Sequence, residues 1–204
     1  MTREPTFAEL VARAAVLAAG PRRVLGITGA PGSGKSTLAA RLVEALGDRA
    51  ALVGMDGFHL AHTVLARLGR VERKGAPDTF DADGYADLLR RLRTSTDRTV
   101  YAPEFRREVE DPIACAVPVP CEVSLVVTEG NYLLLWPQIR PLLDEVWFLD
   151  LDQDERRERL YQRHLAFGRT PDQARGRTDG SDETNAGLVA DTARKADLVL
   201  RKIQ

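Results

Sequence analysis

Short, continuous runs of apolar residues recur along the chain, and segments with helical periodicity separate them. The apolar runs lie at residues 24–28, 51–55, 123–128, 146–149 and 196–200. Because they do not alternate apolar with polar positions, they are typical of strands buried on both faces. Helices are expected at residues 6–17, 35–46, 85–92, 155–167 and 183–194. Strands that alternate with helices predict an α/β fold with a parallel sheet covered on both sides.

One region breaks this alternation. About fifty residues, at 70–122, separate the second expected strand from the third, and this is far more than a crossover connection needs. The region carries proline and glycine turn signals and one expected helix. We predict an insertion beside the sheet, with a short hairpin, that builds a substrate pocket; an inert excursion is the alternative. The 204 residues are otherwise expected to form a single domain, 1–204.

Composition narrows the possible partners. The net charge is −1, from 29 basic and 30 acidic residues, which argues against nucleic acid and anionic membranes as partners. No run reaches the ~18 apolar residues of a membrane helix. Cys115 and Cys121 fit no metal or redox spacing, and no secretory segment is evident, so we expect a cytoplasmic protein.

The strongest chemical signal follows the first strand. Residues 29–36, GAPGSGKS, match the pattern G-x-x-x-x-G-K-[ST] between a strand and a helix, as a phosphate-binding loop requires. Backbone N–H groups of such a loop converge on phosphate oxygens, and the helix N-terminus favours negative charge. Lys35 is expected to reach the β- and γ-phosphates, Ser36 to bind Mg²⁺, and Thr37 to contact the α-phosphate. The expected ATP-binding residues are Gly29, Ala30, Pro31, Gly32, Ser33, Gly34, Lys35, Ser36 and Thr37.

Two carboxylates follow the next two strands. The carboxyl ends of parallel strands share one edge of a sheet, so Asp56 and Glu129 are expected beside the phosphate loop. Asp56 is placed to accept the proton of an attacking hydroxyl, and Glu129 to hold magnesium. The alternatives are a turn aspartate and a solvent-facing carboxylate.

These motifs carry a family resemblance. The chain resembles the P-loop small-molecule kinases grouped with uridine kinase, phosphoribulokinase and bacterial-type pantothenate kinase, most of all the nucleoside/nucleotide kinase or fructose-transport kinase subgroup. The stretches that match are GITGAPGSGKSTLA, MDGFHL, RKGAPDTFD, the APEF-RR-EDP segment, TEGNYLLL, R-x-x-x-R-H and D-x-x-N, from about residue 22 to 200.

The resemblance implies a three-layer P-loop fold with five parallel strands in the order 2-3-1-4-5 and a lid at about 155–182. It makes Asp56 the base, Lys35 and Ser36 the phosphate and magnesium residues, and Glu129 the acid beside the metal. Arg163 is then the lid arginine over the transferring phosphate. His59 stands where uridine kinases have Tyr, which argues against uridine as the substrate.

Other residues are weaker candidates. Arg156 and Arg159 are expected on a solvated helix, Arg107 on the surface, and His164 in packing. The expected substrate-binding residues are Asp56, His59, Lys74, Arg106, Asn131, Tyr132 and Asn185.

Other classes of protein that contain a phosphate-binding loop of this kind fit the sequence less well. A GTPase needs N-K-x-D and a transporter ATPase an LSGGQ-like signature, and the chain has neither. A P-loop ATPase or nucleotide-regulated binding module without an acceptor stays open. The sequence favours a kinase that uses ATP and Mg²⁺ to phosphorylate a hydroxyl of a small molecule; a nucleoside, a sugar and a pantothenate-like alcohol remain possible acceptors.

Overall fold

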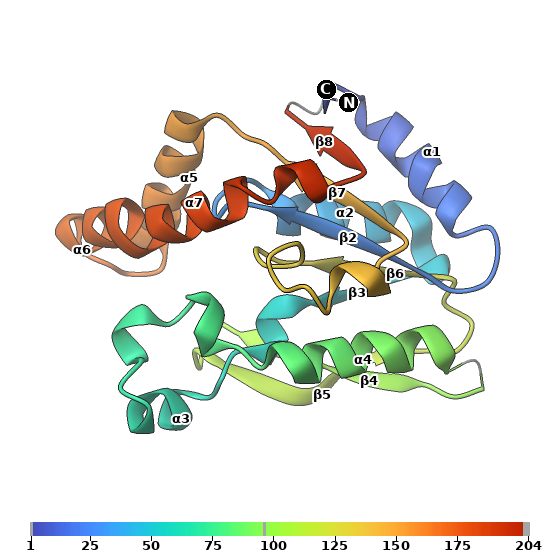
Figure 1. Ribbon diagram of the computed structural model, residues 1–204, viewed down its shortest axis with the longest axis horizontal. Coiled ribbons are helices and arrows are strands. Elements are labelled where there is room, and N and C mark those ends of the chain that lie inside the picture. The colour runs from blue at the N-terminus through green and yellow to red at the C-terminus, as the bar shows by residue number, and fades with distance from the viewer. Residues whose placement is uncertain (1, 96, 202–204) are drawn as a thin grey trace.

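A parallel sheet forms the centre of the protein, whose structure is a computed structural model that describes residues 2–95 and 97–201. Its strands are β1 (Thr2–Arg3), β2 (Arg23–Gly29), β3 (Ala50–Gly54), β6 (Leu125–Glu129), β7 (Glu145–Leu149) and β8 (Leu198–Leu200). They are ordered β1-β8-β7-β2-β6-β3, and every pairing is parallel (Figure 1). Counted along the chain, the five expected strands have the predicted order 2-3-1-4-5. The short strand β1 adds an edge that was not predicted.

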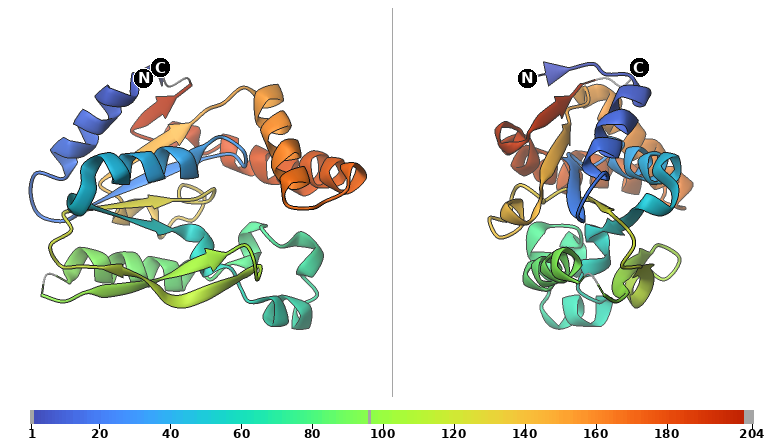
Figure 2. Two further views of the ribbon diagram at one scale, coloured as in Figure 1. Left: turned by 180° about the vertical axis from the view of Figure 1, so that it is seen from behind. Right: turned by 90° about the vertical axis from the view of Figure 1, so that its right-hand side faces the viewer.

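Both faces of the sheet are buried. Alternate side chains of the strands, such as Leu25 and Val24, belong to separate hydrophobic clusters. Helices α1 (Phe7–Leu17) and α2 (Lys35–Leu46) cover one face, and α4 (Ala82–Thr94) and α7 (Glu183–Ala190) pack on the other (Figure 2). The three-layer α/β architecture is therefore confirmed.

The last helix is shorter than its sequence pattern predicts. Helix α7 ends at Ala190, and Ala193–Lys195 form a separate 3-10 turn. The hydroxyl of Thr192 donates to the carbonyl of Val189 at 2.6 Å, and the backbone N–H of Thr192 donates to the same carbonyl at 2.9 Å. A threonine that bonds locally to the backbone competes with helix continuation.

The insertion contains the predicted hairpin. Strands β4 (Val100–Arg106) and β5 (Asp111–Val119) pair antiparallel and lie beside α4, below the sheet in Figure 1. Helix α3 (His62–Arg67) and the turns that follow it project from the same end. The hairpin tip, residues 107–110, is thereby directed toward the carboxyl ends of the sheet strands.

A helical arm projects above this end of the insertion. It consists of α5 (Gln153–Ala166), α6 (Pro171–Arg177) and a π-helical turn (Thr178–Asp182), and we refer to residues 153–182 as the arm. Gly168, at φ +81°, ends α5, and a capping box of Thr170 and Gln173 starts α6. The arm coincides with the segment expected to be a lid.

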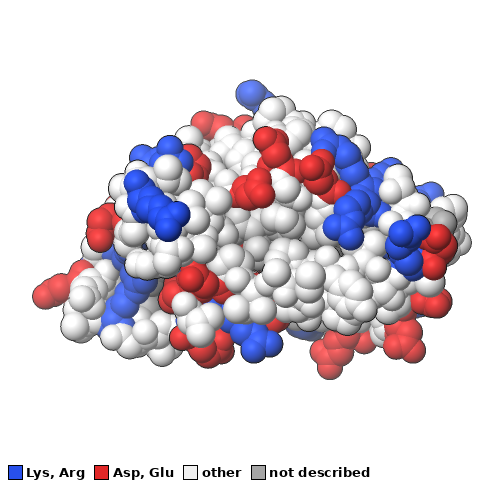
Figure 3. All heavy atoms as spheres, turned by 90° about the horizontal axis from the view of Figure 1, so that it is seen from below, with Lys and Arg blue, Asp and Glu red and all other residues white. Residues whose placement is uncertain are grey.

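Acidic and basic side chains are mixed on the face that carries the insertion. In Figure 3 they surround a largely uncharged middle, and no single sign covers that face. Within the described residues, no helix has both the length and the apolar character that a bilayer-spanning segment requires.

Candidate active site

The phosphate loop runs from the end of β2 into α2. Gly29, Gly32 and Gly34 adopt positive φ values of +148°, +82° and +93°, which favour glycine. At Gly32 a Cβ would also lie 2.7 Å from Cγ of Leu160 and 2.8 Å from the carbonyl of Arg156. The loop therefore rests directly against the arm, and no larger residue fits there.

Lys35 lies inside this loop. Its side chain is buried, and Nζ donates to the carbonyl of Ala30 at 2.9 Å. Burial lowers the pKa of Lys35 to about 8, while the charges of Glu129 and Asp56 act in the opposite direction. The lysine is thus within electrostatic range of the Glu129 and Asp56 carboxylates, both at the edge of the sheet formed by the carboxyl ends of its strands, which we call the rim.

Strand register explains this convergence. Glu129 of β6 pairs with Ile27 of β2 on one side and with Gly54 of β3 on the other. The phosphate loop starts two residues after Ile27, and Asp56 follows two residues after Gly54. Parallel pairing therefore brings three loops to one level of the rim, as the sequence predicts for ligand binding.

The two rim carboxylates repel each other. Burial and, after it, the charge of Asp56 raise the pKa of Glu129 to about 7, although Lys35 and the Ser36 hydroxyl act against this rise. Two acidic groups, an ammonium and a hydroxyl are thus concentrated at the rim, an arrangement that suits a bound cation and phosphate oxygens.

A cavity of about 550 Å³ opens from this group. The phosphate loop and rim provide one end, through Lys35, Ser36, Asp56, Glu129 and Asn131. The insertion provides one wall, and the arm together with the start of α7 provides the other. The cavity therefore joins the phosphate site to the two segments that sequence analysis assigned to substrate and lid.

His59 and Lys74 lie in the insertion wall. The His59 ring stacks at 3.9 Å on Phe80 and at 4.7 Å on Phe105, and Nδ1 lies 2.8 Å from the carbonyl of Asp56. Burial lowers the pKa of His59, so the ring is neutral at pH 7. Lys74 Nζ lies 3.8 Å from the Asp111 carboxylate and 5.1 Å from the Phe105 ring centre.

Asn185 and Asn131 also line the cavity. Asn185 is buried, and its Nδ2 donates to the carbonyl of Gly75 at 3.4 Å, which connects α7 to the insertion. These two side chains lie where the sequence placed them.

Two predicted substrate residues lie elsewhere. Arg106 is directed away from the cavity, beside Glu104 at 3.5 Å, because side chains alternate along β4 and Phe105 takes the inward position. Arg107 is exposed, as expected, and it also lines the cavity. Tyr132 is fully buried behind the wall, where its hydroxyl donates to the carbonyl of Gly75 at 2.6 Å.

The arm contributes Arg163 and His164. Both line the cavity, and His164 Nε2 lies 2.7 Å from the carboxylate of Asp182. His164 therefore borders the site, and with its side chain only 12% exposed it is also packed, as expected. The sequence signal for it was the R-x-x-x-R-H motif, in which it directly follows Arg163.

Arg156 also departs from expectation. Only 4% of it is exposed, and its guanidinium donates to the carbonyl of Pro31 at 3.4 Å and forms an ion pair with Glu183. It joins the arm to the phosphate loop and to α7. Arg159, by contrast, forms the expected exposed pair with Glu155 at 2.6 Å.

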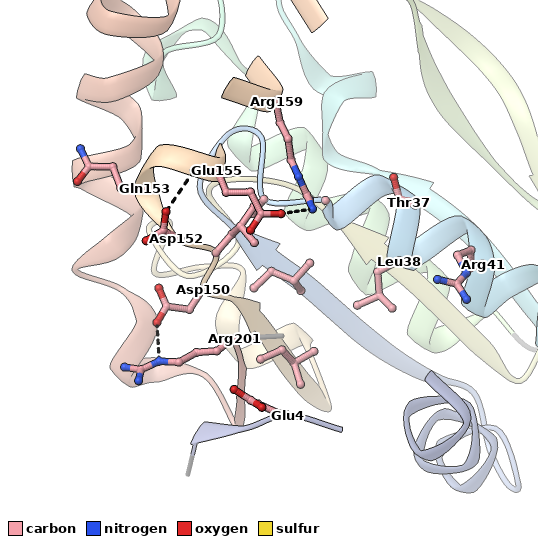
Figure 4. A pocket seen from close by; sticks show the side chains of 15 residues that line it. Glu4, Thr37, Leu38, Arg41, Asp150, Asp152, Gln153, Glu155, Arg159 and Arg201 are labelled. Atoms are coloured by element: carbon pink, nitrogen blue, oxygen red, sulfur yellow. Dashed lines mark hydrogen bonds and ion pairs between the residues drawn. The ribbon is translucent and has the colours of Figure 1, made fainter. Parts of the chain in front are cut away.

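A second cavity, of about 1020 Å³, lies on the other side of the phosphate loop (Figure 4). It is lined from α2 by Thr37, Leu38 and Arg41, and from the ends of β7 and β8 by Asp150, Asp152 and Arg201. Of these residues the sequence analysis identified only Thr37, although the ends of the fourth and fifth strands lie on the same rim. The phosphate loop thus separates two cavities.

Relatives share most of the chain. A Schizosaccharomyces pombe protein, provisionally named uridine kinase, is 36% identical over 98% of this chain and 92% of its own length. The uridine kinase of Leuconostoc citreum is 31% identical over 70% of this chain and 68% of its own.

A solved structure and a family profile add to this. The crystal structure of a provisionally named fructose transport system kinase from Silicibacter sp. TM1040 has a TM-score of 0.86 at 36% identity, covering 95% of this chain and 98% of that one. Residues 2–58 match the family described as methylmalonyl Co-A mutase-associated GTPase MeaB. That match ends just after Asp56 and comprises the phosphate-binding region.

Proposed function

This chain belongs to the uridine kinase-like family of P-loop kinases and is an ATP-dependent phosphotransferase. We propose that it transfers the γ-phosphoryl group of ATP to a hydroxyl of a small molecule, with Mg²⁺ as cofactor. One observation supports this most strongly: the phosphate loop lies between two cavities. Thr37 lines one and Ser36 the other, so a nucleotide and an acceptor can reach the loop from opposite sides. A reaction with two substrates needs this arrangement, and a nucleotide switch does not.

Asp56 is the base in this proposal. It lies at one end of the cavity of about 550 Å³, which we call the acceptor cavity, next to Glu129 and within electrostatic range of Lys35. An acceptor hydroxyl held there donates its proton to the Asp56 carboxylate as its oxygen attacks the γ-phosphorus. Lys35 and Arg163 stabilise the charge of the transferring group.

The residues present suit magnesium. Mg²⁺ is usually bound by one or two carboxylates together with substrate phosphates, and Glu129 and the Ser36 hydroxyl supply oxygen donors beside the loop. Two rim carboxylates that repel each other also favour a nearby cation. Across residues 2–95 and 97–201, no group of three His, Cys, Asp or Glu forms a metal site by itself. When bound, the ion neutralises charge on the β- and γ-phosphate oxygens.

The arm and the insertion are the parts that enclose the acceptor. A lid that closes over both substrates excludes water, so transfer to the acceptor exceeds hydrolysis. The cytoplasm suits such a reaction, and Cys115 and Cys121 are free thiols, as a reducing compartment maintains.

The test is acceptor-dependent ADP release. With ATP and Mg²⁺ alone, release is expected to be slow, and a suitable small alcohol is expected to raise it sharply. The panel includes nucleosides, sugars and pantothenate-like alcohols. Rapid hydrolysis that no acceptor stimulates would instead support an ATPase or a regulatory module.

A further inference from the structure

The acceptor cavity has an excess of positive charge. The chain as a whole has a net charge of −1, whereas the cavity is lined by six basic side chains and four acidic ones. The basic residues are Lys35, Lys74, Arg107, Arg163, Arg169 and Arg177, and the acidic residues are Asp56, Glu110, Glu129 and Asp182. An excess of this sign favours anionic ligands.

The four arginines of the cavity also lack carboxylate partners. Within the part of the chain that the structure describes, none of them forms an ion pair. Two arginines of α5 that do not line the cavity behave differently: Arg156 pairs with Glu183, and Arg157 pairs with Asp179 at 2.6 Å. Ion pairs are thus present at these two positions of α5 and missing, among the described residues, at the three arm arginines that line the cavity, Arg163, Arg169 and Arg177.

Three of these arginines come from separate segments and meet near one point. Arg107 lies at the hairpin tip, Arg163 in the last turn of α5, and Arg169 between α5 and α6. The Arg107 guanidinium lies 5.5 Å from the ring centre of Phe167, so the tip reaches the arm. Burial lowers the pKa of Arg163, and the charges of Arg107 and Arg169 lower it further. Like charges held together in this way are stabilised by an anion between them.

ATP accounts for only part of this charge. Lys35 lies within the phosphate loop, and Arg163 lies on the arm and also lines the cavity. We assign these two side chains to the phosphates of the nucleotide. Arg107 comes from the opposite wall, next to Phe105 and on the same side as His59. It faces the space that the acceptor occupies, and it does not line the second cavity, of about 1020 Å³, in which we place the nucleotide.

We propose that the acceptor is itself an anion: a small alcohol that carries a carboxylate or phosphate group, which Arg107 and Arg169 bind while its hydroxyl lies at Asp56. This inference rests on the proposed kinase function. The stacked rings of His59, Phe80 and Phe105 contact the carbon skeleton. In the reaction, the acceptor oxygen forms a bond to the γ-phosphorus, the bond from that phosphorus to the bridging oxygen breaks, ADP leaves, and the hydroxyl proton passes to Asp56.

The first experiment compares matched acceptors. ADP release is measured with glycerol, D-glycerate and glycerol 3-phosphate, and with fructose, gluconate and fructose 1-phosphate, beside neutral nucleosides including uridine. Charged members are expected to stimulate release, and the carboxylate and phosphate arms separate the two anions. Equal or better stimulation by the neutral members overturns the inference but leaves the kinase intact. No stimulation by any compound contradicts the kinase function itself.

The second experiment uses a matched pair of neighbouring arginines. Losing a hydrogen bond to a charged group typically costs enough to change affinity roughly 10- to 100-fold. Arg107→Gln is therefore expected to raise the KM of the stimulating anion by about that factor and to leave the KM of ATP unchanged. Arg106→Gln is the control, because that side chain is directed away from the cavity. A raised KM for ATP with an unchanged KM for the acceptor assigns Arg107 to the nucleotide and overturns the inference. Arg107 is exposed, so the substitution does not endanger folding.

Discussion

The two sides of the site are built differently. On the phosphate side, Lys35 and Ser33 are buried, and Gly32 fits against the backbone carbonyl of Arg156 in the arm. On the acceptor side, Arg107 is exposed, and the charged groups come from segments that are far apart in the chain. The phosphate side is therefore rigid and suited to one ligand, ATP. The acceptor side depends on how a hairpin and an arm approach each other, which is where substrate choice is determined.

Asp56 lies at the junction of the two sides, and its replacement is expected to have the largest effect. Asn is nearly isosteric, so the binding of ATP is expected to change little. The amide cannot accept the hydroxyl proton as a carboxylate does, and loss of a general base typically costs about 10²- to 10⁴-fold in rate. The loose transition state of phosphoryl transfer favours the lower part of this range.

The measurement is turnover together with nucleotide affinity for Asp56→Asn, with Glu129→Gln as the comparison. Glu129→Gln is expected to raise the magnesium requirement as well as to lower the rate. Normal turnover of Asp56→Asn would show that another group on the rim takes the proton. The base would then have to be sought among the remaining carboxylates of the cavity, Glu110, Glu129 and Asp182.

Arg156 tests whether the phosphate side is as rigid as its burial indicates. The side chain is 5% exposed and pairs with Glu183, which is 32% exposed. Breaking a buried ion pair costs about 3–5 kcal/mol, and the partial exposure of Glu183 reduces this, so Arg156→Gln is expected to lower the free energy of unfolding by about 2 kcal/mol.

Arg157→Gln is the matched control on the same helix. Arg157 and Asp179 are 39% and 54% exposed, so losing this pair should cost less than about 1 kcal/mol. Urea unfolding of both variants gives the comparison through their midpoints at equal slope. Equal losses would mean that the contact between arm and loop contributes no more than a surface pair.

The sequence predicted the phosphate side of the site well and the acceptor side less well. The phosphate loop, Asp56 and Glu129 follow from one motif and from parallel strands that share a rim, so local pattern and register suffice to bring them together. In the insertion, a shift of one residue along β4 exchanges an inward side chain for an outward one, and Arg106 was chosen where Arg107 lines the cavity. Nothing in the charge pattern marks Arg156 as buried, because its partners Pro31 and Glu183 are distant in sequence.

The pH dependence of magnesium use probes the rim itself. Burial and Asp56 raise the pKa of Glu129 to about 7, so the proton leaves this carboxylate near neutral pH instead of near its ordinary value. Because metal and proton compete for the ionised group, apparent magnesium affinity is expected to fall by up to about tenfold for each pH unit below about 7 and to be level above it. The half-saturating Mg²⁺ concentration, measured through ADP release between about pH 6 and pH 8, reports this. Glu129→Gln should remove the slope, and a wild-type profile that is already flat would mean that Glu129 titrates at its ordinary pKa.

Tyr132 carries the smallest expected effect, and it tests the boundary of the acceptor side directly. The sequence places this residue in the pocket wall, whereas the structure buries its ring against Phe80 and Trp136 at centroid distances of 5.6 and 5.4 Å. Tyr132→Phe keeps the ring and removes one hydrogen bond to the carbonyl of Gly75, which still accepts from Asn185. A single hydrogen bond contributes about 1 kcal/mol, so the variant should lose about that much unfolding free energy with its acceptor KM within about twofold of wild type. Thermal or urea unfolding and acceptor kinetics on the same preparation separate the two roles. Unchanged stability with a KM raised about tenfold would place the Tyr132 hydroxyl on the acceptor, and the boundary between core and pocket would then lie one residue further along the chain than Asn131.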